Sequence, residues 1–168
     1  VPPVLAAYPH TVVVNSFSKE LSLAGERLGY FAVNPAAEDA EAIVAAASVV
    51  NAMHVVNAPS LFQQAVARVI GATVDVSIYQ RRRDLIGGIM TAAGYEFNLP
   101  EGAFYLFPKS PISDDARFTE MLRDERILVS PGRAFGAPGY FRISYAVPDT
   151  TISGSEEGFR RALQKARG

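Results

Sequence analysis

Two short runs near the start of the chain, residues 11–14 and 27–33, are rich in apolar and β-branched side chains. A continuous apolar run without polar alternation is typical of a strand that is buried on both faces, as in a parallel sheet covered by helices. The serines and Gly25 between the two runs predict a loop. The pattern therefore predicts two buried strands of an α/β layer, joined by this loop.

Helical periodicity follows these strands. Asn34 and Pro35 predict a helix start, because asparagine caps the first turn and proline fits the first helical position. The expected buried stripe of this helix is Ile43, Val44, Ala47 and Val50. Ser60 and Gln63 have the capping-box spacing that predicts a second helix. Its expected apolar face is Leu61, Phe62, Ala65, Val66, Val69 and Ile70.

A third helical stretch follows Gly71, and we expect Gly94 to end it in the left-handed conformation. Its apolar side is Val74, Ile78, Leu85, Ile86, Ile89 and Met90. From Tyr95 onward short strands alternate with helices, which predicts an α+β subdomain. The expected strands are 95–98, 104–107, 127–129 and 140–146, and the expected helices are 114–125 and 155–167. We therefore divide the chain into residues 1–58, connecting helices at 59–94, and a small domain at 95–168.

The composition narrows the classes of function. At 168 residues and 49% hydrophobic content, the chain can bury a real core. Its net charge is −1, and its longest block of like charge is Arg81 to Arg83, so neither nucleic acid nor an anionic membrane is an expected partner. The absence of cysteine excludes thiolate chemistry and fits a cytoplasmic location. No apolar stretch approaches the roughly 20 residues that a membrane span needs.

Lys19 lies in the predicted loop, between Ser16, Ser18 and the second strand. A lysine in a loop is most often a solvated surface charge. Loops at the carboxyl ends of strands in open α/β sheets are, however, where ligands bind. Desolvation and a neighbouring cation, which Arg27 could supply, both favour the neutral amine that a nucleophile requires.

Arg27 precedes the second predicted strand, where a guanidinium needs a partner. Glu20 or Glu26 would be an ordinary partner. A bound phosphate is the sharper hypothesis, held by Arg27 and by the hydroxyls of Ser16 and Ser18. An amine beside a phosphate cradle suggests pyridoxal 5'-phosphate as a cofactor.

Arg142 lies in the predicted strand 140–146. Alternation places it on one face with Tyr140 and Ser144, opposite a face that includes Phe141. Such an arginine is commonly solvated, but it could also bind a substrate carboxylate with its fork of N–H donors. The Gly/Pro-containing segments 100–105 and 130–136 have the composition of ordinary turns.

Together these segments resemble the fold-type I aminotransferases, in particular the aspartate aminotransferase-like class I/II group. The similarity covers essentially the whole chain and rests on five motifs in the family's order. They are Ser16-Phe17-Ser18-Lys19, Gly25-Glu26-Arg27-Leu28-Gly29-Tyr30, Pro100-Glu101-Gly102-Ala103-Phe104-Tyr105, Ser130-Pro131-Gly132 through Phe135-Gly136, and Arg142-Ile143-Ser144-Tyr145-Ala146. Glu26 departs from the tryptophan that many relatives have there, which we expect to alter packing and not the reaction.

The resemblance implies that Lys19 forms the aldimine with pyridoxal phosphate and shuttles a proton between the substrate α-carbon and the cofactor. It also implies that Ser16 and Arg27 hold the cofactor phosphate, while Arg142 binds the α-carboxylate of an amino acid or 2-oxo acid. Ser18 is a further expected cofactor-binding residue. The expected fold is an incomplete fold type I: a remnant of the large α/β/α domain followed by the small carboxy-terminal α+β domain. The family's other cofactor-binding residues would lie upstream, so we expect the chain alone to be inactive and its full-length parent to be a homodimer.

Two other interpretations share these residues. The same scaffold and lysine serve lyases and decarboxylases that depend on the same cofactor. An aminotransferase-like domain can also serve as a non-catalytic module of a regulator.

Overall fold

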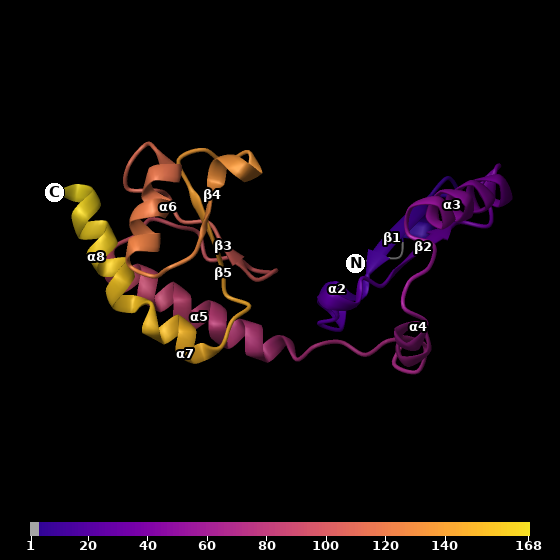
Figure 1. Cartoon of the computed structure of the whole chain (residues 1–168), viewed down its shortest axis with the longest axis horizontal. Helices are drawn as coiled ribbons and strands as arrows, with labels where there is room; N and C mark the ends of the chain where they lie inside the picture. Colours follow the sequence, from indigo (N-terminus) through magenta and orange to yellow (C-terminus); the bar gives the residue numbers. More distant parts are fainter. Residues whose placement is uncertain (1–3) are drawn as a thin grey trace. The chain divides into compact units, whose positions relative to one another are not determined.

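The computed structural model describes residues 4–168, which form two compact units (Figure 1). The boundary between the units follows Val74, inside the segment 59–94 that was expected to connect two domains. The first unit contains α1 (Val4–Ala7), β1 (Val12–Ser16), α2 (Phe17–Glu20), the 3-10 helix η1 (Ala24–Glu26), β2 (Gly29–Val33), α3 (Ala40–His54) and α4 (Ser60–Ala67). The second contains α5 (Val76–Ala93), β3 (Tyr105–Leu106), α6 (Asp115–Asp124), β4 (Ser130–Pro131), the 3-10 helix η2 (Gly132–Phe135), β5 (Phe141–Ser144), α7 (Asp149–Gly154) and α8 (Glu156–Arg167).

The two strands of the first unit pair with each other in antiparallel register, with Val12 opposite Val33 and Ser16 opposite Gly29. Both strands were predicted, but their expected place in a parallel sheet is wrong. The connection between them reverses the chain, and antiparallel strands need no crossover helix to pair. Burial on both faces is also wrong, since the side chain of Val14 is 78% exposed. The first unit therefore has an open two-stranded ribbon and not a covered layer.

Asn34 does not start a helix, because α3 begins at Ala40. The Asn34 side chain is buried and accepts a hydrogen bond from the Ala36 N–H at 3.0 Å. It also donates to the carbonyls of Leu5 at 2.7 Å and Tyr8 at 3.1 Å. This asparagine consequently ties the segment before β1 to the end of β2.

The apolar faces of α3 and α4 are less buried than their periodicity predicts. No residue of α3 is buried, and Val66 is the buried residue of α4. The expected capping box is absent, because the Gln63 amide donates to Asn57 and to the Ala58 carbonyl. An amphipathic pattern marks a face that can be buried, but burial also needs a partner layer.

The second unit has a three-stranded antiparallel sheet in the order β3-β5-β4. The predicted helices α5, α6 and α8 are confirmed, and Gly94 ends α5 with a φ of 89° in the left-handed region. Residues 95–98 and 127–129 were expected to be strands, but neither segment is in a sheet, and α7 was not anticipated. Very short segments give too little periodicity to define their pairing.

The core of this unit forms where helices cover one face of β5. Phe141 and Ile143 point into this core, while Arg142 and Ser144 alternate to the other face, as predicted. The main helical contributions come from α5, α6 and α8. The buried cluster includes Ile86, Ile89, Met90, Tyr95, Leu106, Phe118, Leu122, Ile127, Phe141, Ile143, Tyr145, Ile152, Phe159, Ala162 and Leu163.

Leu122 provides a test of this core. It is fully buried, so Leu122→Ala should reduce the free energy of unfolding by about 2–5 kcal/mol through lost burial and a residual cavity. Leu128 is 83% exposed, and Leu128→Ala should change stability by less than about 0.5 kcal/mol. Hydrogen-exchange mass spectrometry in increasing urea, read from peptides of residues 75–168, measures both. Equal effects of the two substitutions would contradict the assigned core.

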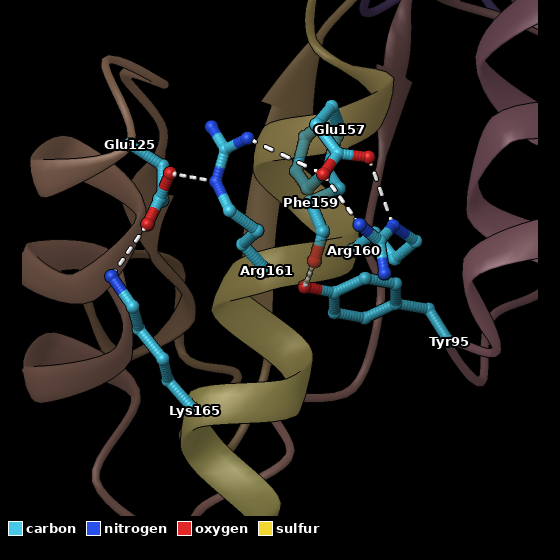
Figure 2. A network of polar contacts seen from close by, with 7 residues as sticks. All are labelled: Tyr95, Glu125, Glu157, Phe159, Arg160, Arg161 and Lys165. Carbon is cyan, nitrogen blue, oxygen red and sulfur yellow. Dashed lines mark hydrogen bonds and ion pairs between the residues drawn. The ribbon is translucent and has the colours of Figure 1, made fainter.

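Glu125 links the end of α6 to α8 (Figure 2). Its carboxylate accepts hydrogen bonds from Arg161 Nε at 2.7 Å and from Lys165 Nζ at 2.6 Å. Hydrogen bonds from Lys165 and Arg161 hold the pKa of Glu125 below its ordinary value of 4.5. Nearby, the buried Tyr95 hydroxyl donates to the Phe159 carbonyl at 3.0 Å, and burial raises the pKa of Tyr95. Polar contacts thus fix α8 on two sides.

The lowered pKa of Glu125 predicts a pH dependence of stability. The contribution is fully present above the unfolded-state pKa, near 4.5, and is lost as pH falls through the lower folded-state pKa. Glu125→Gln should therefore destabilise the second unit at neutral pH and flatten its loss of stability as the pH falls below about 4.5. Denaturant unfolding at several pH values checks this, with Glu156→Gln in the exposed first turn of α8 as the control. A slope unchanged from the parent chain would refute the assignment.

Candidate functional site

The connection between β1 and β2 holds four of the predicted site residues. Ser16 ends β1, and Gly29 begins β2 directly opposite it. The connection is closed by a hydrogen bond of 3.1 Å from the Phe17 N–H to the Leu28 carbonyl. Ser18 and Lys19 lie on α2 within this connection, and Arg27 follows η1. The fold therefore places all four residues at the same end of the ribbon.

The two serines of this group are hydrogen-bonded to each other through their hydroxyls. Ser16 Oγ caps α2 by accepting from the Ser18 N–H at 3.2 Å. The same oxygen lies 2.7 Å from Ser18 Oγ. The two hydroxyls therefore lie side by side, and Ser18 directly precedes Lys19 in the chain.

Arg27 has an unusual backbone conformation, with a φ of 52° in the left-handed region. Its Nη1 donates to the Ala24 carbonyl at 2.9 Å, across the turn of η1. Neither Glu20 nor Glu26 pairs with it, since the ion pairs found within residues 4–168 do not involve Arg27. The guanidinium has further N–H donors beyond the one that Ala24 accepts.

Gly29 allows the ribbon to close beside this group. A Cβ atom at this position would lie 2.4 Å from the Asn15 carbonyl oxygen, which is a backbone atom of β1. Real side chains do not approach so closely, so any larger residue would push the strands apart. The glycine before Tyr30 is therefore a requirement of strand pairing next to the candidate site.

Arg142 lies on the solvent-facing side of β5 in the second unit, in contact with two aromatic rings. Its guanidinium carbon is 3.8 Å from the ring centroid of Phe135 and 4.3 Å from that of Tyr105. By composition the segments carrying these two rings have the character of ordinary turns, and only the family resemblance singled them out. Their aromatic residues could have indicated this contact, because turns do not require aromatic side chains and arginine stacks readily on aromatic faces.

The described part of the chain lacks two other kinds of feature. Among residues 4–168, no group of three histidine or acidic side chains is placed to hold a metal ion. No helix in the same range combines the length and apolar character that crossing a bilayer requires.

The profile of the family described as "Aminotransferase class I and II" matches residues 2–154. The chain belongs to this family, whose members use pyridoxal 5'-phosphate.

Individual relatives agree with this assignment. An aspartate/prephenate aminotransferase of Thermus thermophilus is 34% identical over 167 residues, covering 94% of this chain and 42% of the relative. The crystal structure of an amino transferase from Eubacterium rectale is similar over 100% of this chain, with 38% identity and a TM-score of 0.88. That of an aspartate aminotransferase from Rhizobium meliloti has 30% identity over 92% of this chain and a TM-score of 0.76. The chain spans 42% of each of these two solved chains.

The close approach at Gly29 can be tested directly. Gly29→Ala should abolish pairing at the Ser16 end of the ribbon, because the added Cβ meets the Asn15 carbonyl. Gly25→Ala is the matched control, since a Cβ there meets nothing within 4 Å. Hydrogen exchange of the β1 and β2 amides should become faster in the first variant and stay unchanged in the second. Retained protection in Gly29→Ala would contradict the observed register.

Proposed function

We propose that this chain is part of an aminotransferase that moves an amino group between an L-amino acid and a 2-oxo acid, with pyridoxal 5'-phosphate as its cofactor. The observation that supports this most directly is the donor set on the β1–β2 connection: the Lys19 amine, the Ser16 and Ser18 hydroxyls and the Arg27 guanidinium. Family membership adds the cofactor class.

The donor set fits the cofactor chemically. Hydroxyls and a guanidinium suit a phosphate monoester, which carries up to two negative charges and strong acceptor oxygens. A primary amine suits an aldehyde. Ser16, Ser18 and Arg27 would hold the phosphate, and Lys19 would hold the aldehyde carbon.

The reaction assigns separate tasks to the residues of this chain. When bound, the cofactor supplies an electron-withdrawing ring that stabilises negative charge at the substrate α-carbon. Lys19 Nζ would then act as the acid and base that moves a proton between that carbon and the cofactor. In the second unit, Arg142 would orient the substrate by binding its α-carboxylate with two parallel N–H donors.

The whole enzyme is proposed to be a homodimer longer than this chain, and the chain alone to have little or no turnover. The relatives that the chain matches are more than twice its length. Parts of the cofactor site that residues 1–168 do not supply would have to come from the remainder of such a protein.

Lys19 can be identified by trapping. The chain has two other lysines, Lys109 paired with Glu96 and Lys165 paired with Glu125, which serve as internal controls. After incubation with pyridoxal phosphate and reduction with borohydride, peptide mass spectrometry should find the adduct mainly on Lys19. Lys19→Arg should abolish this adduct, and Arg27→Gln should reduce its yield by weakening phosphate binding. Equal labelling of all three lysines would overturn the proposed role of Lys19.

A further inference from the structure

Asp115 is a fully buried carboxylate in the first turn of α6. Its Oδ2 accepts from the Arg133 backbone N–H at 2.8 Å, and its Oδ1 accepts from Arg133 Nε at 2.6 Å. Burial opposes ionisation of Asp115, but hydrogen bonds from Arg133 outweigh it and keep its pKa below the ordinary range. The neighbouring Asp114 accepts from Arg133 Nη2 at 2.6 Å. Two carboxylates at the start of α6, one of them on its N-cap residue, therefore hold both the main chain and the guanidinium of one arginine.

Arg133 is the second residue of η2, and the start of this turn is fixed from another direction as well. The Gly132 N–H donates to the Tyr140 carbonyl at 2.8 Å, and the Ala137 N–H donates to the Gly132 carbonyl at 3.0 Å. A Cβ on Gly132 would lie 2.2 Å from the Ala137 carbonyl oxygen, so the backbones are in close contact. The turn is thus held at Gly132 to the residue that precedes β5, and at Arg133 to α6.

Phe135 is the last residue of this fixed turn. Its ring contacts the Arg142 guanidinium at 3.8 Å and the Phe107 ring edge-on, with centroids 6.1 Å apart. A ring packed on the face of a guanidinium leaves the N–H donors, which lie in the guanidinium plane, accessible at its edge. The position of Phe135 consequently limits how Arg142 can meet a ligand.

We propose that Asp115 is a positioning residue for Arg142. By holding Arg133, Asp115 fixes η2, and η2 places Phe135 against the guanidinium so that its edge faces an incoming carboxylate. The inference rests on the proposed role of Arg142 in binding carboxylates. It adds a buried acid on α6, which touches neither cofactor nor substrate, to the determinants of that binding.

The experiment uses the 168-residue chain and the NMR signal of the Arg142 side-chain Nε–H group, assigned by its loss in Arg142→Lys. Ring currents from Phe135 and Tyr105 should shift this signal away from that of exposed arginines. Asp115→Asn keeps the size of the side chain but removes its charge, and it should move the signal towards the exposed position. Phe135→Leu should move it in the same direction. Leu122→Ala weakens α6 without touching Arg133 and should leave the signal in place.

A titration with 2-oxoglutarate separates this inference from the proposed function. In the unsubstituted 168-residue chain, 2-oxoglutarate should perturb the Arg142 signal. In Asp115→Asn the apparent affinity for 2-oxoglutarate should fall several-fold. An Arg142 signal that Asp115→Asn does not move, or that Leu122→Ala moves equally, overturns the positioning role even if 2-oxoglutarate binds. A parent chain in which 2-oxoglutarate leaves Arg142 unperturbed overturns the carboxylate assignment, and with it the functional meaning of Asp115.

Discussion

The strict alternation of β5 is the constraint on which the second unit depends. Phe141 and Ile143 enter the core, and Arg142 between them must emerge on the opposite face. A slip of the strand by one residue would bury a guanidinium and expose two large apolar side chains, which costs far more than the few hydrogen bonds of so short a sheet. Hydrophobic packing therefore determines where the candidate carboxylate-binding group is presented, although no core residue need touch a ligand.

The first unit achieves a similar result with backbone geometry. Its ribbon is largely exposed, so packing contributes little, and the connection is instead defined by strand register, by the Phe17–Leu28 hydrogen bond and by a glycine that permits close approach. The Ser16 hydroxyl caps α2, the single helical turn that carries Ser18 and Lys19. Local hydrogen bonding here does what a hydrophobic core does in the second unit.

The sequence predicted the elements that carry their own signal. The long helices α5 and α8, the Gly94 terminator and the faces of β5 follow from periodicity and from one special backbone position. Strand pairing in the first unit could not be predicted, because an apolar run defines a strand but not its neighbour. The motif residues Ser16, Ser18, Lys19 and Arg27 were predicted as a group, and the structure places them on one connection. The rings on Arg142 and the Asp115–Arg133 contact depend on residues distant in sequence, which no local pattern reveals.

The left-handed backbone of Arg27 has a consequence for stability. A residue with a Cβ atom costs on the order of 1 kcal/mol in that conformation, whereas glycine adopts it without penalty. Among the described residues, Ser22, Val56, Ala103 and Arg126 carry the same cost. The chain therefore tolerates this backbone strain at several turns, and the packing and hydrogen bonds around each turn must offset it.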